Sequence, residues 1–455
     1  MKPLELIRKY NVPGPRYTSY PTVPFWKENQ MQPKQWLTSL QNEQKLHEQP
    51  TLGLYIHLPF CESLCTFCGC HKRITKNHAV EIPYIESVLE EWVLYQPYLE
   101  PNTQITELHL GGGTPTFFSA EALTQLIEGI FKLRNTQTAP CDLSFEAHPN
   151  STSAQQLEAL YKLGFRRISF GIQDYNPIVQ EAIHRVQTFE QVQRVHQLAK
   201  EIGYTSINHD LVYGLPFQDL EGFQTTIEKT IGLKPERIAL YGYAHVPWVK
   251  GTGQRGYDEN NLPKDAQKRA LYEMAYELLL RAGYIAIGMD HFALPGDALA
   301  LAFEKKALHR NFMGYTQQQT DVMLGLGMSA ISDTWRAFAQ NDKSVEAYQE
   351  RISKGELAIF RGHFLNDEEL LIRRHILDLM CHFQTNWNPA LLEAGFYKVI
   401  IERLSMLSED NLIDINQNGV RVLSEGYAFV RNVCMAFDLD LHGHHFDKPL
   451  FSATI

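Results

Sequence analysis

The sequence predicts an α/β protein built on a full or partial (β/α) barrel. From about residue 51 to 290, short strand-like runs alternate with helical stretches, which is the pattern of a parallel sheet covered by helices. Before residue 51 this alternation is missing, and from about residue 350 it gives way to helices around a short hairpin. We therefore expect an N-terminal arm (1–50), a barrel domain (51–350) and a small, mostly helical C-terminal domain (351–455).

The expected strands follow one another at intervals that leave room for a helix between them. One of these helices is marked at both ends, by a capping box of Ser153 and Gln156 and by Gly164. Chemistry in such barrels collects at the carboxyl ends of the strands, so we look there for a functional site. The expected strands are residues 52–58, 105–110, 142–148, 166–172, 206–214, 236–243 and, with a weaker pattern, 284–289.

Composition and charge exclude several classes of protein. With 44% apolar and 21% charged residues, the chain has the composition of a globular protein with a sizeable core. A net charge of −10 without a long basic stripe argues against a nucleic-acid surface. The first residues carry charges and prolines where a signal peptide needs an apolar stretch, and no run reaches the roughly 18 apolar residues of a membrane helix. We therefore expect a cytoplasmic protein without nucleic-acid or membrane partners.

The loop after the first expected strand is the most unusual stretch of the chain. HLPFCESLCTFCGCHKR (57–73) contains four of the seven cysteines, Cys61, Cys65, Cys68 and Cys70. Clustered cysteines in a reducing compartment bind metal more often than they form disulfides. A zinc site usually takes cysteine pairs from distant parts of the sequence. Three cysteines spaced C-x3-C-x2-C instead suit three corners of a [4Fe–4S] cube whose fourth iron stays open; a structural zinc site and a thiol patch are the alternatives.

This loop resembles that of the radical S-adenosylmethionine (SAM) enzymes. Together with further motifs along the chain, it resembles the oxygen-independent coproporphyrinogen III oxidases in particular. The resemblance extends from about residue 10 to the C-terminus. Each motif alone is weak evidence for this family. The resemblance rests on the occurrence of all the motifs in the same order along the chain. The motifs are CESLCTFCGC, PGPRYTSYPT, LHLGGGTPT, GIQDYNP, DLVYGLP, IGMDHFALP, LHRNFMGYT and GLGMSAIS.

The resemblance implies a cluster, two SAM molecules and a set of residues that hold them. Cys61, Cys65 and Cys68 would ligate the [4Fe–4S] cluster, and Cys70 would belong to the motif without being a ligand. Tyr55 and Glu146 would be the catalytic residues. The contacts to the SAM on the cluster would be Tyr55, Gly112, Glu146 and Ile331, and those to the second SAM would be Phe67, Gly113, Thr114, Gln173, Arg185, Asp210 and Ala244.

The implied reaction is an oxidative decarboxylation in haem biosynthesis. A SAM-derived radical would take a hydrogen from a propionate side chain of coproporphyrinogen III, and loss of CO2 and one electron would leave a vinyl group. Two such events would give protoporphyrinogen IX. The implied partners are the porphyrinogen and a low-potential electron donor, and we expect a monomer. The closest alternatives are a haem chaperone and a haem-degrading methyltransferase of the same superfamily, and the chaperone type lacks Cys70 and the arm motif (13–22).

The chemistry of the residues themselves leaves alternatives open. Consecutive glycines in GGGTP allow the backbone to approach a ligand, although such a run can also be a simple turn. Glu146 and Asp210 are carboxylates in apolar strands, where an unpaired charge is costly. The sulfonium, ammonium or hydroxyl groups of SAM would be partners for them, and an arginine is the alternative partner. Arg185 by default would be a solvated helix residue.

Several residues are left for the structure to place. Arg16 and Arg310 are candidates for the propionates of the substrate, although a surface or structural role is equally compatible with their positions. Phe338 stands where the family pattern leads us to expect a tyrosine, and Ala453 where it leads us to expect a basic residue. The histidines near the end, His442, His444 and His445, allow a second metal site, but a solvated chain end is the favoured interpretation.

Overall fold

One large sheet organises this computed structural model, which describes residues 3–28, 31–134, 137–248, 254, 257–443 and 450–454. Across the sheet the strand order is β1–β17–β16–β15–β14–β2–β5–β6–β7–β8–β9–β11–β10. The neighbouring strands from β14 to β9 in this order are all parallel. They are β14 (Val322–Leu326), β2 (Thr51–Leu58), β5 (Gln104–Gly112), β6 (Asp142–Ala147), β7 (Arg167–Gln173), β8 (Ser206–Tyr213) and β9 (Arg237–Gly242).

The six strands from β2 to β9 confirm the first six expected strands, with bounds that differ by at most two residues. The seventh, β10 (Ile285–Ile287), is instead an antiparallel edge strand that pairs with β11 (His291–Ala293), and β11 in turn pairs antiparallel with β9. Because β1 and β10 are the two edges, the sheet does not close on itself. The prediction of a (β/α) barrel is therefore confirmed in its partial form.

Beyond β14, the sheet continues as an antiparallel meander. Its strands are β15 (Ile331–Asp333), β16 (Ala337–Asn341) and β17 (Ile359–Phe364), and the N-terminal segment adds the short strand β1 (Lys27–Glu28). The expected boundary at residue 350 lies within helix α11 (Val345–Ser353), and β17, beyond it, still belongs to the large sheet. The sequence pattern missed this strand because it pairs antiparallel with β16 and β1 and so lies outside the alternation of parallel strand and helix.

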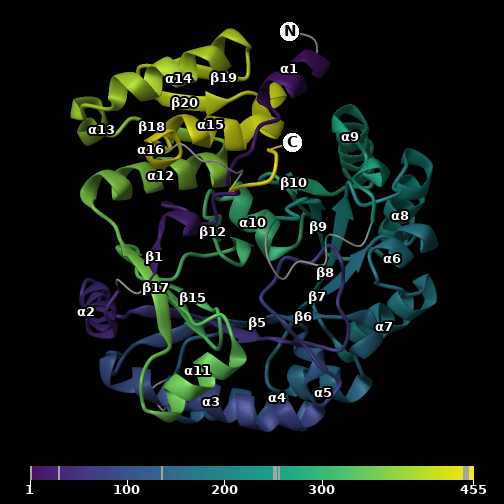
Figure 1. Cartoon of the computed structure of the whole chain (residues 1–455), viewed down its shortest axis with the longest axis vertical. Helices are drawn as coiled ribbons and strands as arrows, with labels where there is room; N and C mark the ends of the chain where they lie inside the picture. Colours follow the sequence, from purple (N-terminus) through teal and green to yellow (C-terminus); the bar gives the residue numbers. More distant parts are fainter. Residues whose placement is uncertain are drawn as a thin grey trace.

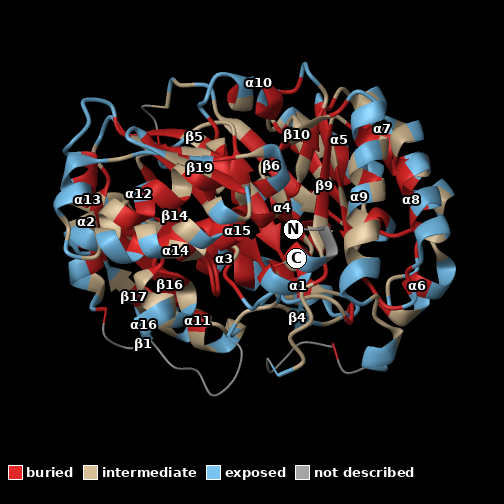
Figure 2. Ribbon diagram, turned by 90° about the horizontal axis from the view of Figure 1, so that it is seen from above, coloured by how far each residue is buried: buried red, intermediate tan, exposed pale blue. Residues whose placement is uncertain are grey.

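Helices line the outside of the parallel strands, as Figure 1 shows along the lower and right-hand sides. Each helix buries one side against the strands, and the outer sides are exposed in Figure 2. The expected capping box is present at Ser153 and Gln156 of α5, and Gly164, just past the end of α5, has φ +103°. The helices are α3 (Glu81–Tyr95), α4 (Ala120–Lys132), α5 (Ala154–Lys162), α6 (Pro177–Ala182), α7 (Phe189–Ile202), α8 (Leu220–Leu233) and α9 (Asp265–Arg281).

The C-terminal segment has a core of its own. It packs around α12 (Asp367–His382), α14 (Tyr397–Glu409) and α15 (Val430–Phe437), and it includes a three-stranded sheet in the order β18–β20–β19. The remaining elements of this segment are α13 (Pro389–Glu393), α16 (Leu439–Gly443), β18 (Gln384–Asn386), β19 (Ile413–Asn416) and β20 (Gly419–Val422).

The N-terminal segment joins this second core rather than standing apart from it. Helix α1 (Pro3–Tyr10) lies beside the C-terminal helices in Figure 1. The buried Tyr17 hydroxyl donates to Asp438 at 3.0 Å, and the Arg431 guanidinium donates to the carbonyl of Pro15 at 2.8 Å. The start and the end of the chain are therefore fixed to each other by buried polar contacts.

Short elements complete the fold. They are α2 (Pro33–Gln44), α10 (Ala298–Glu304), β3 (Phe60–Cys61), β4 (Arg73–Ile74), β12 (His309–Asn311) and β13 (Gly314–Thr316). In the described part of the chain, no helix is both long and apolar enough to cross a bilayer.

Candidate functional site

Polar residues alternate with apolar ones along the parallel strands, and the polar ones share one face. Strand β5 shows the pattern: Leu108 and Leu110 are fully buried among apolar residues, whereas Glu107 and His109 point to the other face. The pairing register places His109 beside Ser144 of β6, and Glu146 of β6 beside Ser169 of β7. The concave side of the partial barrel is therefore a polar surface shared by all the central strands.

A cavity of about 730 Å³ opens at the carboxyl ends of these strands. This is within the roughly 300–1,000 Å³ range of small-molecule sites. Most of the residues expected in a cofactor site line it. They are Cys61, Cys65, Phe67, Cys68, Gly112, Gly113, Thr114, Glu146, Gln173, Arg185, Asp210 and Ala244.

The cysteine loop is held in place by its backbone. Thr66 donates from its amide to Ile183 at 3.0 Å and from its hydroxyl to Ala182 at 3.0 Å, so the loop is attached to the end of α6. The short parallel pair β3–β4 closes its base. The Lys72 ammonium donates to the carbonyls of Cys68 and Cys70. The loop is therefore positioned by contacts that leave the thiols free for another role.

The three predicted cluster cysteines face the same cavity, which is the arrangement that a shared cluster needs. Cys61 Sγ lies 3.2 Å from Thr114 Oγ1, and Cys65 Sγ accepts from Arg185 Nη1 at 3.6 Å. Burial raises the pKa of the Cys61 thiol to about 11, and the hydrogen bond with Thr114 opposes this rise in part. Within the described ranges, no three His, Cys, Asp or Glu side chains converge as the ligands of a single ion do. A four-iron cluster spreads its thiolates over different irons, so the donor set fits such a cluster.

The glycines of GGGTP allow this loop to lie directly on the cysteine loop. A Cβ on Gly113 would lie 2.5 Å from the backbone carbon and oxygen of Pro59. Gly112 has φ +112°, and a Cβ there would lie 2.7 Å from the His57 ring. The amides of Gly113 and Thr114 donate to Leu58 and Phe60 at 2.8 and 3.0 Å. Close packing therefore requires the glycines, in addition to any contact with a ligand.

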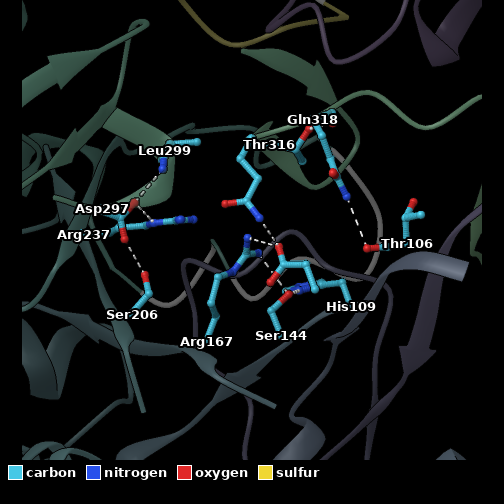
Figure 3. A network of polar contacts seen from close by, with 12 residues as sticks. Thr106, His109, Ser144, Arg167, Ser206, Arg237, Asp297, Leu299, Thr316 and Gln318 are labelled. Atoms are coloured by element: carbon cyan, nitrogen blue, oxygen red, sulfur yellow. Dashed lines mark hydrogen bonds and ion pairs between the residues drawn. The ribbon is translucent and has the colours of Figure 1, made fainter. Parts of the chain in front are cut away.

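Glu146 is the end of a hydrogen-bonded series that crosses the inside of the barrel. Its carboxylate accepts from the Gly112 amide at 3.2 Å and lies 3.5 Å from His109 Nε2. His109 Nδ1 lies 2.8 Å from Ser144 Oγ, which accepts from Arg167 at 3.1 Å. Figure 3 shows His109, Ser144 and Arg167 directed toward one another from adjacent strands. Burial raises the pKa of Glu146, but the hydrogen bond and charge of His109 outweigh it and hold this pKa below its usual value.

The series continues toward the amino ends of the strands. Arg167 donates to Asp142 at 2.5 Å, and Gln317 donates to the same carboxylate at 2.8 Å. A second group at this level joins Arg237 and Ser206 to Asp297, at 2.6 and 2.7 Å (Figure 3). These contacts fix the charged residues of the barrel interior below the cavity.

Asp210 and Arg185 line the same cavity as Glu146. Asp210 accepts from Ser169 at 2.8 Å and from Asn208 at 2.7 Å. Burial is the main cause that raises its pKa to about 6. Arg185 donates to the carbonyl of Gly171 at 2.7 Å, while its buried Nε has no partner among the described atoms. Arg185 is therefore part of the cavity wall, and the default reading as a solvated helix residue is not what the structure has.

Gln254, a residue that no sequence pattern singled out, joins Phe67 to Ala244. The Gln254 amide donates to the carbonyls of Phe67 at 3.2 Å and Ala244 at 3.0 Å, and its oxygen accepts from the Val246 amide at 2.6 Å. Gln254 is 3% exposed, so these contacts are shielded from water.

Tyr55 and Ile331 lie outside the described lining of the cavity. The Tyr55 ring stacks on His109 with centroids 6.1 Å apart, and its hydroxyl lies 3.1 Å from His57 Nδ1. Tyr55 is thus next to the pair of His109 and Glu146. Ile331 is in β15, across β14 from Tyr55, and packs with Trp26 and Phe338.

The residues left open by the sequence lie in different surroundings. Arg16 lines the cavity, and Arg310 donates to its carbonyl at 3.4 Å, so these two candidates for the substrate are neighbours. Phe338 is fully buried and stacks on Trp26 at 4.8 Å between centroids. His442 lies 3.1 Å from the Met435 carbonyl, while His444 and His445 lie outside the described residues.

His109, Ser144 and Arg167 were also missed by the sequence analysis. Their signal is the alternation of polar and apolar residues within ITELHL, DLSFEA and RISFGIQ, which indicates a polar inner face. For Gln254 we find no such signal, because it lies in an irregular segment.

Comparisons with known proteins agree with one another. Residues 55–230 match the family model of the radical SAM superfamily. An oxygen-independent coproporphyrinogen III oxidase of Helicobacter pylori is 37% identical over 455 residues, covering 98% of this chain and 99% of that protein. The enzyme of the same description from Escherichia coli is 36% identical, covering 96% and 94%. The solved structure of coproporphyrinogen III oxidase from Escherichia coli, a radical SAM enzyme, matches with a TM-score of 0.87 at 34% identity, covering 96% and 98%.

Proposed function

The chain belongs to the oxygen-independent coproporphyrinogen III oxidases of the radical SAM superfamily, and we propose that its barrel cavity carries out their reaction on two propionates of coproporphyrinogen III. It is a radical SAM enzyme of haem biosynthesis, and membership of the superfamily implies a [4Fe–4S] cluster and SAM. The observation that carries the proposal is that Cys61, Cys65 and Cys68 line the same cavity as Glu146 and Asp210.

In this proposal the protein binds and orients, and the bound groups supply the bond breaking. When bound, the cluster and SAM supply a low-potential electron and a carbon radical that accepts a hydrogen atom from the propionate. Cys61, Cys65 and Cys68 would hold the cluster. Cys70 lines the same cavity, and its proposed role as a motif residue without a ligand function rests on its position outside the C-x3-C-x2-C spacing.

Glu146 is suited to bind a cationic or hydroxyl group of SAM. Its carboxylate already accepts one amide hydrogen and lies beside His109, which together favour the ionised form. The carboxylate is therefore available as an acceptor at neutral pH. Tyr55, stacked on His109, would limit the motion of this pair and exclude water from behind it.

We further propose that the cavity binds two SAM molecules. The residues assigned to the first, Gly112 and Glu146, come from β5 and β6. Those assigned to the second include Gln173 of β7, Asp210 of β8 and Ala244 after β9. Since these strands are consecutive in the sheet, the two groups of contacts would lie next to each other along one cavity.

Three finer parts of the proposal concern partners and organisation. A low-potential electron donor is required, and we propose that the chain acts as a monomer.

We also propose the division into arm, barrel and C-terminal domain, with the arm and the C-terminal domain covering the cavity entrance. The position of Arg16 in the cavity wall supports this cover. Size-exclusion chromatography with light scattering tests the monomer.

The function is tested by anaerobic incubation with SAM, a strong reductant and coproporphyrinogen III. Mass spectrometry should find loss of CO2 in two steps together with 5′-deoxyadenosine, and the purified protein should contain about four irons per chain. One zinc per chain without iron would contradict the assignment of the chain as a radical SAM enzyme. Transfer of haem without decarboxylation would indicate the chaperone activity instead, and methyl transfer to haem would indicate the degrading methyltransferase.

A further inference from the structure

A second, smaller cavity of about 60 Å³ adjoins the main one behind the end of β9. The two share Arg16, Gly242 and Tyr243, so a group bound in the main cavity can extend into the small one. About 60 Å³ is room for two or three heavy atoms, because a water molecule in the liquid occupies roughly 30 Å³. A carboxylate is a group of about this size.

The wall of this small cavity is cationic, and its charges come from three distant parts of the chain. Arg16 of the N-terminal segment donates to the carbonyl of Gly242 at 2.6 Å. Lys268 of α9 donates to the next carbonyl, that of Tyr243, at 3.2 Å. The two cations therefore bind the carbonyls of neighbouring residues, and both line the small cavity. Arg431 of α15 lines the same cavity and is 6% exposed.

Among the side chains that line this small cavity, one is acidic, Asp290, and four are basic, Arg16, Lys268, Arg269 and Arg431. Asp290 lines the cavity, but its carboxylate lies 2.7 Å from His291 Nδ1 and so is shared with that ring. Arg269 also lines it and is paired with Glu273 at 2.7 Å. Burial, followed by the charges of Arg16 and Arg431, lowers the pKa of Lys268 to about 8. Asp265 opposes this lowering in part, and burial remains its largest cause.

We infer that the small cavity is a carboxylate subsite, in which Lys268 and Arg16 bind one carboxylate of a molecule that occupies the main cavity. Ala453 contributes only a methyl group to the wall, which leaves the space open. Charge-assisted hydrogen bonds from lysine and arginine to a carboxylate are about twice as strong as neutral ones. Arg431, which donates to the carbonyls of Pro15 and Thr454, supplies charge from a fixed position.

Two molecules of the proposed reaction carry carboxylates, and the inference rests on that proposal for their identity. Coproporphyrinogen III has four propionates, and SAM has one methionyl carboxylate. We assign the subsite to a propionate, because the cavity lies on the side of Arg16 and away from the cysteine loop. The test below separates the two sources.

The experiment measures equilibrium binding to the anaerobic holoenzyme by porphyrin fluorescence. The probes are coproporphyrin III and its tetramethyl ester, which has the same ring without the charges. In Lys268→Met and in Ala453→Leu, which fills the cavity, the acid should bind about tenfold to a hundredfold more weakly, and the ester should bind as in the parent. Lys268→Arg should recover most of the affinity for the acid.

The controls make each outcome decisive. Lys305→Met removes an exposed lysine elsewhere and should change neither affinity. Equal melting temperatures show that the variants are folded. If SAM affinity falls in Lys268→Met while coproporphyrin affinity is kept, the assignment to the propionate is overturned and the subsite belongs to SAM. If neither affinity changes, the subsite does not exist. A parent protein that binds no coproporphyrin contradicts the proposed function, and SAM titration then still tests the subsite.

Discussion

His109 Nε2 lies 3.5 Å from a carboxylate oxygen of Glu146, while the other ring nitrogen lies 2.8 Å from Ser144 Oγ. Both ring nitrogens of His109 are therefore occupied by polar partners, and the ring is fixed between β6 and the stacked Tyr55. His109 acts as a positioning residue for Glu146, because it sets both the direction and the ionisation of that carboxylate.

His109→Leu should therefore change the pH dependence of the reaction. Burial raises the pKa of Glu146, and His109 opposes that effect. Without the imidazole ring, the pKa of Glu146 should therefore rise. The acid limb of kcat/KM should move to higher pH, and kcat/KM at pH 7 should fall about tenfold to a hundredfold. His57 and Asp210 still face Glu146 and are unchanged. His109→Gln keeps a hydrogen-bond donor and should restore the position of the acid limb. Equal pH profiles for His109→Leu and His109→Gln would contradict the positioning role of His109.

Gly113→Ala should separate the GGGTP loop from the cysteine loop. The new Cβ meets backbone atoms of Pro59 at 2.5 Å, and backbone cannot yield as a flexible side chain can. We expect a loss of about 1–3 kcal/mol in the free energy of unfolding and incomplete iron binding. Gly69→Ala is the matched control, because nothing lies within 4 Å of its Cβ. Similar iron contents and melting temperatures for both variants would show that the close contact is not required.

Cys65→Ser and Cys70→Ser should differ in iron content. Cys65 is buried and receives a hydrogen bond from Arg185, whereas Cys70 is exposed. The first variant should lose the cluster and the activity together. The second should keep about four irons per chain after anaerobic reconstitution. An equal loss of iron in both would mean that Cys70 is also a ligand.

The buried pair of His196 and His209 should make stability fall in acid. Their ring nitrogens lie 3.1 Å apart, and burial lowers the pKa of His196 to about 4. Between pH 6.5 and about 4 the unfolded chain binds a proton at this position and the folded chain does not, so stability decreases as the pH falls. One such group contributes up to about 1.4 kcal/mol per pH unit. Urea denaturation should give a shallower dependence in His196→Gln, and an unchanged slope would contradict the prediction.

Much of the barrel is visible in the sequence because its signals are local. The alternation of strand and helix predicted six parallel strands, and the spacing of Cys61, Cys65 and Cys68 predicted a shared site at the end of the first. The expected strand at 284–289 is present as β10, but its antiparallel pairing was not expected, and β17 was missed. Strand β17 pairs antiparallel with β16 and with β1, which is distant in the chain, so no local period marks it.

The sequence by itself determined the order of the elements, the cysteine motif and the family, because periodicity and motif spacing are properties of short stretches. Only the tertiary structure decided that His109 of β5 lies beside Glu146 of β6, and that Arg16 and Lys268 bind neighbouring carbonyls at the end of β9. Such contacts depend on the register between strands and on the packing of segments more than 200 residues apart. Neither can be inferred from short stretches of sequence.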